Sequence, residues 1–138
     1  CEEDVADVLK APHTMACTDG FPSQGKCHPR YTASFIRVLE KYVRQEHLLS
    51  LPEAVRKMTS MPAEKLRLPD RGRIAPGYKA DILLLDPEKI HDTADYDRPD
   101  GLAQGLELVM INGLPAMERG ESTGVCAGSV LRRGRPAK

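Results

Sequence analysis

Residues 72–87 constrain the fold of this chain most, because they join a tight turn to an uninterrupted apolar run. Gly72 and Gly77 bracket Pro76; glycine permits the positive φ that a tight turn needs, and proline fixes its own φ. A short apolar run without alternation, closed by a turn, predicts a strand buried on both faces. That run is Ile82, Leu83, Leu84 and Leu85. We expect Asp81, just before it, to hydrogen-bond the backbone of the turn and so fix where the strand begins.

A second strand is predicted over residues 106–111, where apolar positions alternate at the start. Asn112-Gly113 follows, a strong signal for a type I′ hairpin turn, and residues 114–117 form the returning arm. Residues 88–100 are charged and show neither helical nor strand periodicity. We therefore expect a surface loop between the two strands, carrying His91, Tyr96 and Arg98.

The first half of the chain is predicted to be mainly helical. Residues 2–10 form a helix with an acidic first turn, which Pro12 stops. Residues 32–48 carry a broad apolar stripe at helical spacing. Another helix follows Ser50, which is placed as an N-cap with Glu53 at the third position of a capping box. A short helix restarts near Pro62.

One short strand is expected within this helical part. Residues 14–18 are small or β-branched and lead to Asp19-Gly20, which predicts a buried strand ending in a turn. A loop over residues 21–30 then ends in His28-Pro29-Arg30. A helix, a strand and a loop make half of a βα repeat, and the chain begins with Cys1 rather than Met. We therefore expect a piece of a longer protein.

The balance of charge argues against two classes of partner. Among 138 residues, twenty basic side chains balance twenty acidic ones, so no overall field favours nucleic acid or a membrane surface. The basic tail is expected to be solvated, and no apolar run is long enough to cross a bilayer. The four cysteines are irregularly spaced, which predicts free thiols in a reducing, cytoplasmic setting. They contain no C-x-x-C pair, which disfavours a zinc site built from them. The residues of that tail are Arg132, Arg133, Arg135 and Lys138.

Taken together, these motifs resemble the metal-dependent amidohydrolase superfamily. Residues 72–86 have the order G-x-I-x-P-G-x-x-A-D, three apolar residues, any residue and Asp, which is similar to the segment after the catalytic barrel. Residues 109–113, VMING, are similar to the later half of the same signature. Thr18-Asp19-Gly20 and His28-Pro29-Arg30 resemble the N-acyl-D-amino-acid deacylase (D-aminoacylase) branch.

The resemblance implies an α/β fold in two parts. Residues 1–68 would supply the last strand and closing helices of a TIM-type (β/α) barrel. Residues 69–138 would supply the C-terminal strands of a small β-sandwich built from both chain ends. The implied activity is hydrolysis of a C–N bond other than a peptide bond, with a small-molecule N-acyl-D-amino acid as substrate. Strand edges whose neighbours lie outside this chain would be open to self-association.

Asp19 is the candidate catalytic residue. It follows the predicted last barrel strand, at the edge where β/α barrels mount catalytic groups. In the family that this chain resembles, an aspartate there faces the metal, takes a proton from the hydrolytic water and passes it to the leaving nitrogen. Asp19 is thus also the expected ligand of Zn²⁺, or another divalent ion, in the complete enzyme. His28 and Arg30 are expected to contact substrate, since a planar guanidinium suits a carboxylate.

The remaining ligands cannot be placed in this chain, so no metal is expected on the chain alone. Its histidines form no H-x-H pair and no pair four residues apart. Two other functions stay open. One is a dihydroorotase-like hydrolase of cyclic amides within the same family, and the other is a stand-alone, non-catalytic α/β binding module. The coding region upstream of Cys1 would discriminate these classes, because only an enzyme requires an H-x-H strand there. The four histidines are His13, His28, His47 and His91.

Overall fold

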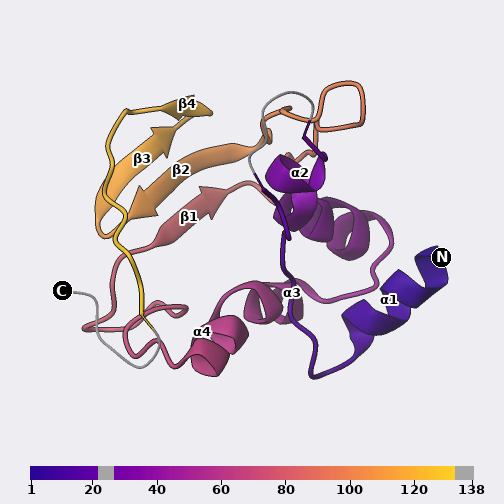
Figure 1. Cartoon of the computed structure of the whole chain (residues 1–138), viewed down its shortest axis with the longest axis horizontal. Helices are drawn as coiled ribbons and strands as arrows, with labels where there is room; N and C mark the ends of the chain where they lie inside the picture. The colour runs from indigo at the N-terminus through magenta and orange to yellow at the C-terminus, as the bar shows by residue number, and fades with distance from the viewer. Residues whose placement is uncertain (22–26, 133–138) are drawn as a thin grey trace.

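The computed structural model describes residues 1–21 and 27–132, with helices first and strands afterwards. Figure 1 shows the strands gathered in one part of the molecule and the helices in another. The predictions for residues 22–26 of the loop and for 133–138 of the basic tail lie outside the described residues. The elements are α1 (Glu2–Lys10), α2 (Arg30–Arg37), η1 (Val38–Gln45), α3 (Leu51–Met58), α4 (Ser60–Leu66), β1 (Ile82–Leu85), β2 (Leu106–Ile111), β3 (Leu114–Glu118) and β4 (Glu121–Ser122).

The helix predictions are largely confirmed. The predicted helix over 32–48 appears as α2 and η1, which follow one another without a break. Its second half is π-helical; at its end the N–H of Glu46 donates to the carbonyl of Lys41, five residues back. Ser50 caps α3, its Oγ accepting from the N–H of Glu53 at 3.3 Å. The Glu53 carboxylate binds Arg56 at 2.8 Å and does not complete the predicted capping box.

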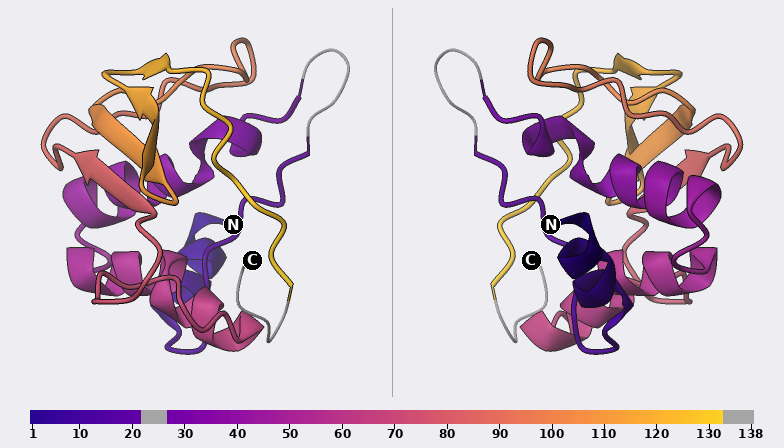
Figure 2. Two further views of the ribbon diagram at one scale, coloured as in Figure 1. Left: turned by 90° about the vertical axis from the view of Figure 1, so that its left-hand side faces the viewer. Right: turned by 90° about the vertical axis from the view of Figure 1, so that its right-hand side faces the viewer.

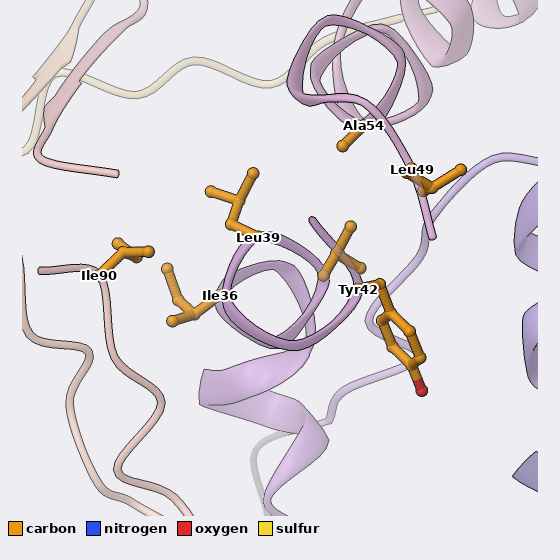
Figure 3. Close-up of a cluster of buried hydrophobic side chains, with 7 residues drawn as sticks. Ile36, Leu39, Tyr42, Leu49, Ala54 and Ile90 are labelled. Carbon is orange, nitrogen blue, oxygen red and sulfur yellow. The ribbon is translucent and has the colours of Figure 1, made fainter. Parts of the chain in front are cut away.

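The core cluster of buried apolar residues lies among the helices and includes one buried residue of the later chain, Ile90. Figure 3 shows Ile90 beside Ile36 and Leu39, with Leu49 and Ala54 on the far side of η1. The hydroxyl of Tyr42 leaves this cluster and donates to Glu2 of α1 at 2.8 Å. Burial is the main reason that the pKa of Tyr42 is raised, and the bond to Glu2 adds to it. The first helix is thus attached by a polar contact.

The predicted strand over residues 14–18 does not form among the described residues. The segment is extended but belongs to no sheet, and it is attached to α3 instead. The N–H of Ala16 donates to the carbonyl of Lys57 at 3.2 Å. The buried ammonium of Lys57 bonds Ala11 O at 2.5 Å and Thr14 O at 3.1 Å. A strand requires a ladder with a neighbour, and no described residue provides one here.

The four strands form one antiparallel sheet in the order β1-β2-β3-β4. Asn112 and Gly113 have φ of 49° and 83°, which confirms the predicted type I′ turn between β2 and β3. The sequence did not predict β4, which has only two residues and follows a second turn of positive φ at Arg119 and Gly120.

The predicted burial of β1 is wrong, although the strand itself is confirmed. Leu83 and Leu84 are 58% and 57% exposed, and Val109 and Ile111 of β2 are only half-buried. Only Leu85 and Leu106, at one end of the sheet, pack against the core cluster. Figure 2 gives two side views of this single sheet and its helical neighbours. The four consecutive apolar residues therefore lie on a sheet that the described helices cover at one end.

The turn before β1 follows its prediction with one change. Gly72 and Gly77 have φ of 81° and 84°. A Cβ at Gly72 would lie 2.7 Å from that of Ala63, so the turn also requires glycine in order to pack on α4. Asp81 does not bond this turn; its Oδ1 accepts from the N–H of Asn112 at 2.8 Å and its carboxylate also pairs with Arg71. Asp81 therefore joins β1 to the hairpin.

The segment over 88–100 is only partly a surface loop. Ile90 and Ala94 are 1% and 4% exposed, and a backbone bridge pairs His91 with Gln104. A single isoleucine in a charged stretch carries no periodicity, so its burial could not be predicted from sequence. No helix in the described residues has the length and apolar character required to cross a membrane.

Candidate functional site

Asp19 lies where the extended 14–18 segment turns toward α2. Its backbone is left-handed, with φ of 45°, and its side chain is 82% exposed. A Cβ on the next residue, Gly20, would lie 2.8 Å from the Cα of Tyr31, so glycine lets the chain pass close to the start of α2. The carboxylate consequently lies 3.1 Å from a guanidinium nitrogen of Arg30, the first residue of that helix.

His28 completes the group from the other side. Its Nδ1 accepts the backbone N–H of Arg30 at 3.1 Å, which satisfies one of the free donors of the first helical turn. Its Nε2 lies 3.1 Å from the hydroxyl of Tyr96, and the two rings meet edge to face with centroids 5.2 Å apart. The structure thus brings together Asp19, His28 and Arg30, the three site residues predicted from sequence.

A pocket of about 270 Å³ opens beside this group. Helix α2 contributes Arg30 and Arg37, its first and last residues, and the later chain contributes Tyr96. From its sequence context, Tyr96 is predicted only as part of a surface loop. The one available signal was an aromatic residue in an otherwise charged stretch, and it did not say where the ring would lie. The full lining is His28, Pro29, Arg30, Ala33, Ser34, Arg37, Asp95 and Tyr96.

A carboxylate on η1 holds the later chain against this pocket. Glu40 is buried; it accepts from the N–H of Asp92 at 2.6 Å and lies 2.8 Å from Nδ1 of His91. Burial raises the pKa of Glu40, but the bonds from Asp92 and His91, with the charges of His91 and Arg44, outweigh it, and the pKa lies below its usual value. Glu40 is therefore an ionised anchor at neutral pH.

A larger hollow, about 900 Å³, lies elsewhere, over the sheet. Leu84 and Glu107 are among its lining residues, and none of the predicted site residues is. We place the candidate site at the smaller pocket, because ionisable groups and a helix start converge there.

The described residues do not form a metal site by themselves. They contain no group of three or more His, Cys, Asp or Glu side chains placed to hold an ion. Asp19 offers one oxygen ligand, and its nearest charged partner is Arg30. The four cysteines are free thiols, as predicted. A zinc site that includes Asp19 would need ligands from outside these residues.

Comparison with known proteins defines the class. Residues 3–116 match the amidohydrolase family, and this chain belongs to that family. The D-aminoacylase of Alcaligenes xylosoxydans xylosoxydans is 39% identical over 132 residues, which are 96% of this chain and 27% of that protein. The chain therefore spans about a quarter of the length of this relative.

Solved structures agree with the fold. A crystal structure of D-aminoacylase superposes with a TM-score of 0.93 at 40% identity, covering 96% of this chain and 28% of the other. The N-acyl-D-glutamate deacylase of Bordetella bronchiseptica, solved with zinc and a phosphonate mimic of the tetrahedral intermediate, gives 0.88 at 36% identity, with the same coverage. The resemblance to the deacylase branch is confirmed.

Proposed function

We propose that these residues form the C-terminal part of a metal-dependent amidohydrolase that removes the acyl group from an N-acyl-D-amino acid. The observation that carries this function is the contact of Asp19 with Arg30 beside His28, in a chain 39% identical to a D-aminoacylase. This contact places a proton acceptor, Asp19, next to Arg30, a group that binds carboxylates. The free cysteines favour a reducing, cytoplasmic setting.

In this proposal residues 1–68 are the end of a β/α barrel, with 14–18 as its last strand, and residues 69–138 belong to a β-sandwich. The exposed apolar surface supports both assignments. Met15, Phe35, Met58 and Leu66 are among the residues around an apolar hollow of about 380 Å³ beside the 14–18 segment. Leu83 and Leu84 expose a second apolar surface on the sheet. Neighbouring barrel and sandwich strands would cover these surfaces.

Asp19 would move the proton in the reaction. As water adds to the amide carbon, its proton passes to the Asp19 carboxylate. Asp19 then gives that proton to the amide nitrogen as the C–N bond breaks, which leaves a free carboxylic acid and a D-amino acid. The zinc ion, when bound, would polarise the carbonyl oxygen and lower the pKa of the attacking water. The described residues would supply one of its ligands, Asp19.

Arg30 would bind the α-carboxylate of the substrate. Its guanidinium is 47% exposed and is already paired with a carboxylate, that of Asp19. A substrate carboxylate would compete for the same planar donors. Asp19 would then be released from its ion pair and become available to water. His28 would line the same pocket and support the first turn of α2.

The test is Asp19→Asn in the full-length enzyme, because the change keeps the shape and removes the base. We expect kcat to fall by about two orders of magnitude or more, with most of the zinc retained. Asp7→Asn, at an exposed aspartate of α1, is the matched control and should keep full activity. Near-normal turnover of the Asp19 variant would contradict the assignment. The 138-residue chain alone should neither hydrolyse the substrate nor bind stoichiometric zinc.

A further inference from the structure

Residues 91–99, here called the 91–99 segment, run beside α2 and η1 and are fastened to them at both ends. At one end Glu40 bonds His91 and the N–H of Asp92, and Arg37 pairs with Asp92 at 2.7 Å. At the other end the hydroxyl of Thr32 donates to the carbonyl of Pro99 at 3.1 Å. Tyr96 lies between these attachments and is held over His28.

The hydrogen bonds of His28 determine its tautomer. The N–H of Arg30 donates to Nδ1, so Nδ1 carries no proton. A neutral ring must then carry its proton on Nε2, which donates to the hydroxyl oxygen of Tyr96 at 3.1 Å. Both ring nitrogens are therefore used, one by the start of α2 and the other by the 91–99 segment.

We infer that Tyr96 is a positioning residue for the reaction: through His28 it orients the first turn of α2 and thereby holds Arg30 where substrate must meet it. This inference rests on the proposed function, in which Arg30 binds the substrate carboxylate. Tyr96 is 73% exposed, so its ring adds little to the core. Its contact with His28 reaches across 68 positions of sequence, from the strand-containing half to the site.

Positioning matters here because the site is open. Arg30 and Asp19 are 47% and 82% exposed at their side chains, so surrounding packing alone does not fix them. The fixed elements nearby are the buried Pro29 and the backbone of Arg30, which His28 binds. Small displacements of substrate-binding groups have large effects on rates. A hydrogen bond that orients His28 therefore affects how well Arg30 binds the substrate carboxylate.

The first test is Tyr96→Phe in the full-length enzyme, which removes the hydroxyl and keeps the ring. For a substrate with a free α-carboxylate we expect KM to rise about threefold to tenfold, as for loss of one hydrogen bond, while kcat stays within about twofold. With the α-carboxylate converted to an amide, Tyr96→Phe should leave KM unchanged. Tyr78→Phe, in the turn before β1, is the control and should match the unaltered enzyme with both substrates. Equal losses with the two substrates would overturn the inference.

Two variants of His28 test whether the effect of Tyr96 on KM passes through the His28 ring. The amide oxygen of His28→Asn can replace Nδ1 as acceptor for Arg30, whereas His28→Gln extends toward Tyr96 and loses that acceptor. We expect His28→Asn to keep more of the carboxylate preference than His28→Gln. In the His28→Gln background, Tyr96→Phe should cause no further rise in KM, because both changes break the same hydrogen-bond network. Additive effects of the two changes would contradict a role through His28.

The tautomer can be measured without any substrate. Long-range ¹H–¹⁵N spectra of histidine-labelled protein, assigned with His28→Asn, should show His28 as the Nε2–H tautomer, and Tyr96→Phe should give a mixture. An Nδ1–H ring in the unaltered protein, or an unchanged Nε2–H ring in Tyr96→Phe, would overturn the inference. If the unaltered enzyme does not hydrolyse N-acyl-D-amino acids, the proposed function fails. The tautomer then decides separately whether Tyr96 orients His28.

Discussion

The helical region, residues 1–68, and the strand-containing region, residues 69–138, bury their apolar residues very differently. Among the described residues other than proline, eight of the ten buried apolar side chains lie in the first region and only Ile90 and Ala94 in the second. Yet the longer uninterrupted apolar run, Ile82–Leu85, is in the second. A short apolar run therefore predicts a strand, whereas the burial of that strand depends on which elements cover the sheet.

The largest expected difference between the regions is in the cost of removing a leucine side chain. Leu39 is 8% exposed and Leu84 is 57% exposed. Leu39→Ala should lower the free energy of unfolding by about 2–5 kcal/mol, the usual cost of a buried leucine. Leu84→Ala in this chain should cost less than about 1 kcal/mol. Denaturant melts measure both, and equal costs would remove the distinction between the two regions.

Within the helical region, the next largest loss of stability is expected from removing the buried ammonium group of Lys57. Lys57 is 2% exposed and donates to Ala11 O and to Thr14 O and Oγ1. Lys57→Met should cost about 1.5–3 kcal/mol, because the oxygens around a buried charged donor lose it. Lys65→Met, at an exposed lysine of α4, should change stability by less than about 0.5 kcal/mol. If Lys57→Met leaves the free energy of unfolding unchanged, residues 11–16 are held by other contacts.

The stability that the contact between the two regions provides should depend on pH, because Glu40 of η1 bonds His91 and Asp92. Its pKa is lowered in the folded protein from a usual 4.5. Its ionised form therefore stabilises the fold above that usual value, and this stability is lost as pH falls through the lowered pKa. The stability difference between the unaltered chain and Glu40→Gln, from urea melts, should shrink on acidification. Glu107→Gln, at the exposed glutamate of β2, is the control. A pH-independent difference would contradict the role of Glu40.

The exposed sheet should also make this chain self-associate, an effect we expect to be modest and dependent on concentration. β1 is an edge of the sheet and exposes Leu83 and Leu84. Leu83→Lys should weaken the association, since charge on an edge strand opposes strand addition. Leu102→Lys changes an exposed leucine outside the sheet and serves as control. If the chain sediments as a monomer at all concentrations, the exposed sheet does not cause self-association. That result would favour the stand-alone binding module.

Local sequence signals predicted the elements well wherever one short stretch contained the whole cause. Ser50 caps a helix because its own hydroxyl reaches the N–H of Glu53. Asn112-Gly113 forms a type I′ turn because both residues tolerate positive φ. The residues of the candidate site were also found, since Asp19 and His28-Pro29-Arg30 form motifs that resemble the deacylase branch. The roles of these residues remain predictions.

Three features were decided only by the tertiary structure, because their causes lie far apart in the chain. Ile90 is buried since it meets Ile36 and Leu39 from another element. The 14–18 segment bonds Lys57 of α3 and lies in no sheet. Tyr96 reaches the site because Glu40 and Thr32 hold the ends of its segment. Local sequence signals alone set the helices, the strands β1 to β3 and their turns. Contacts between distant residues decided which faces are covered and which side chains meet.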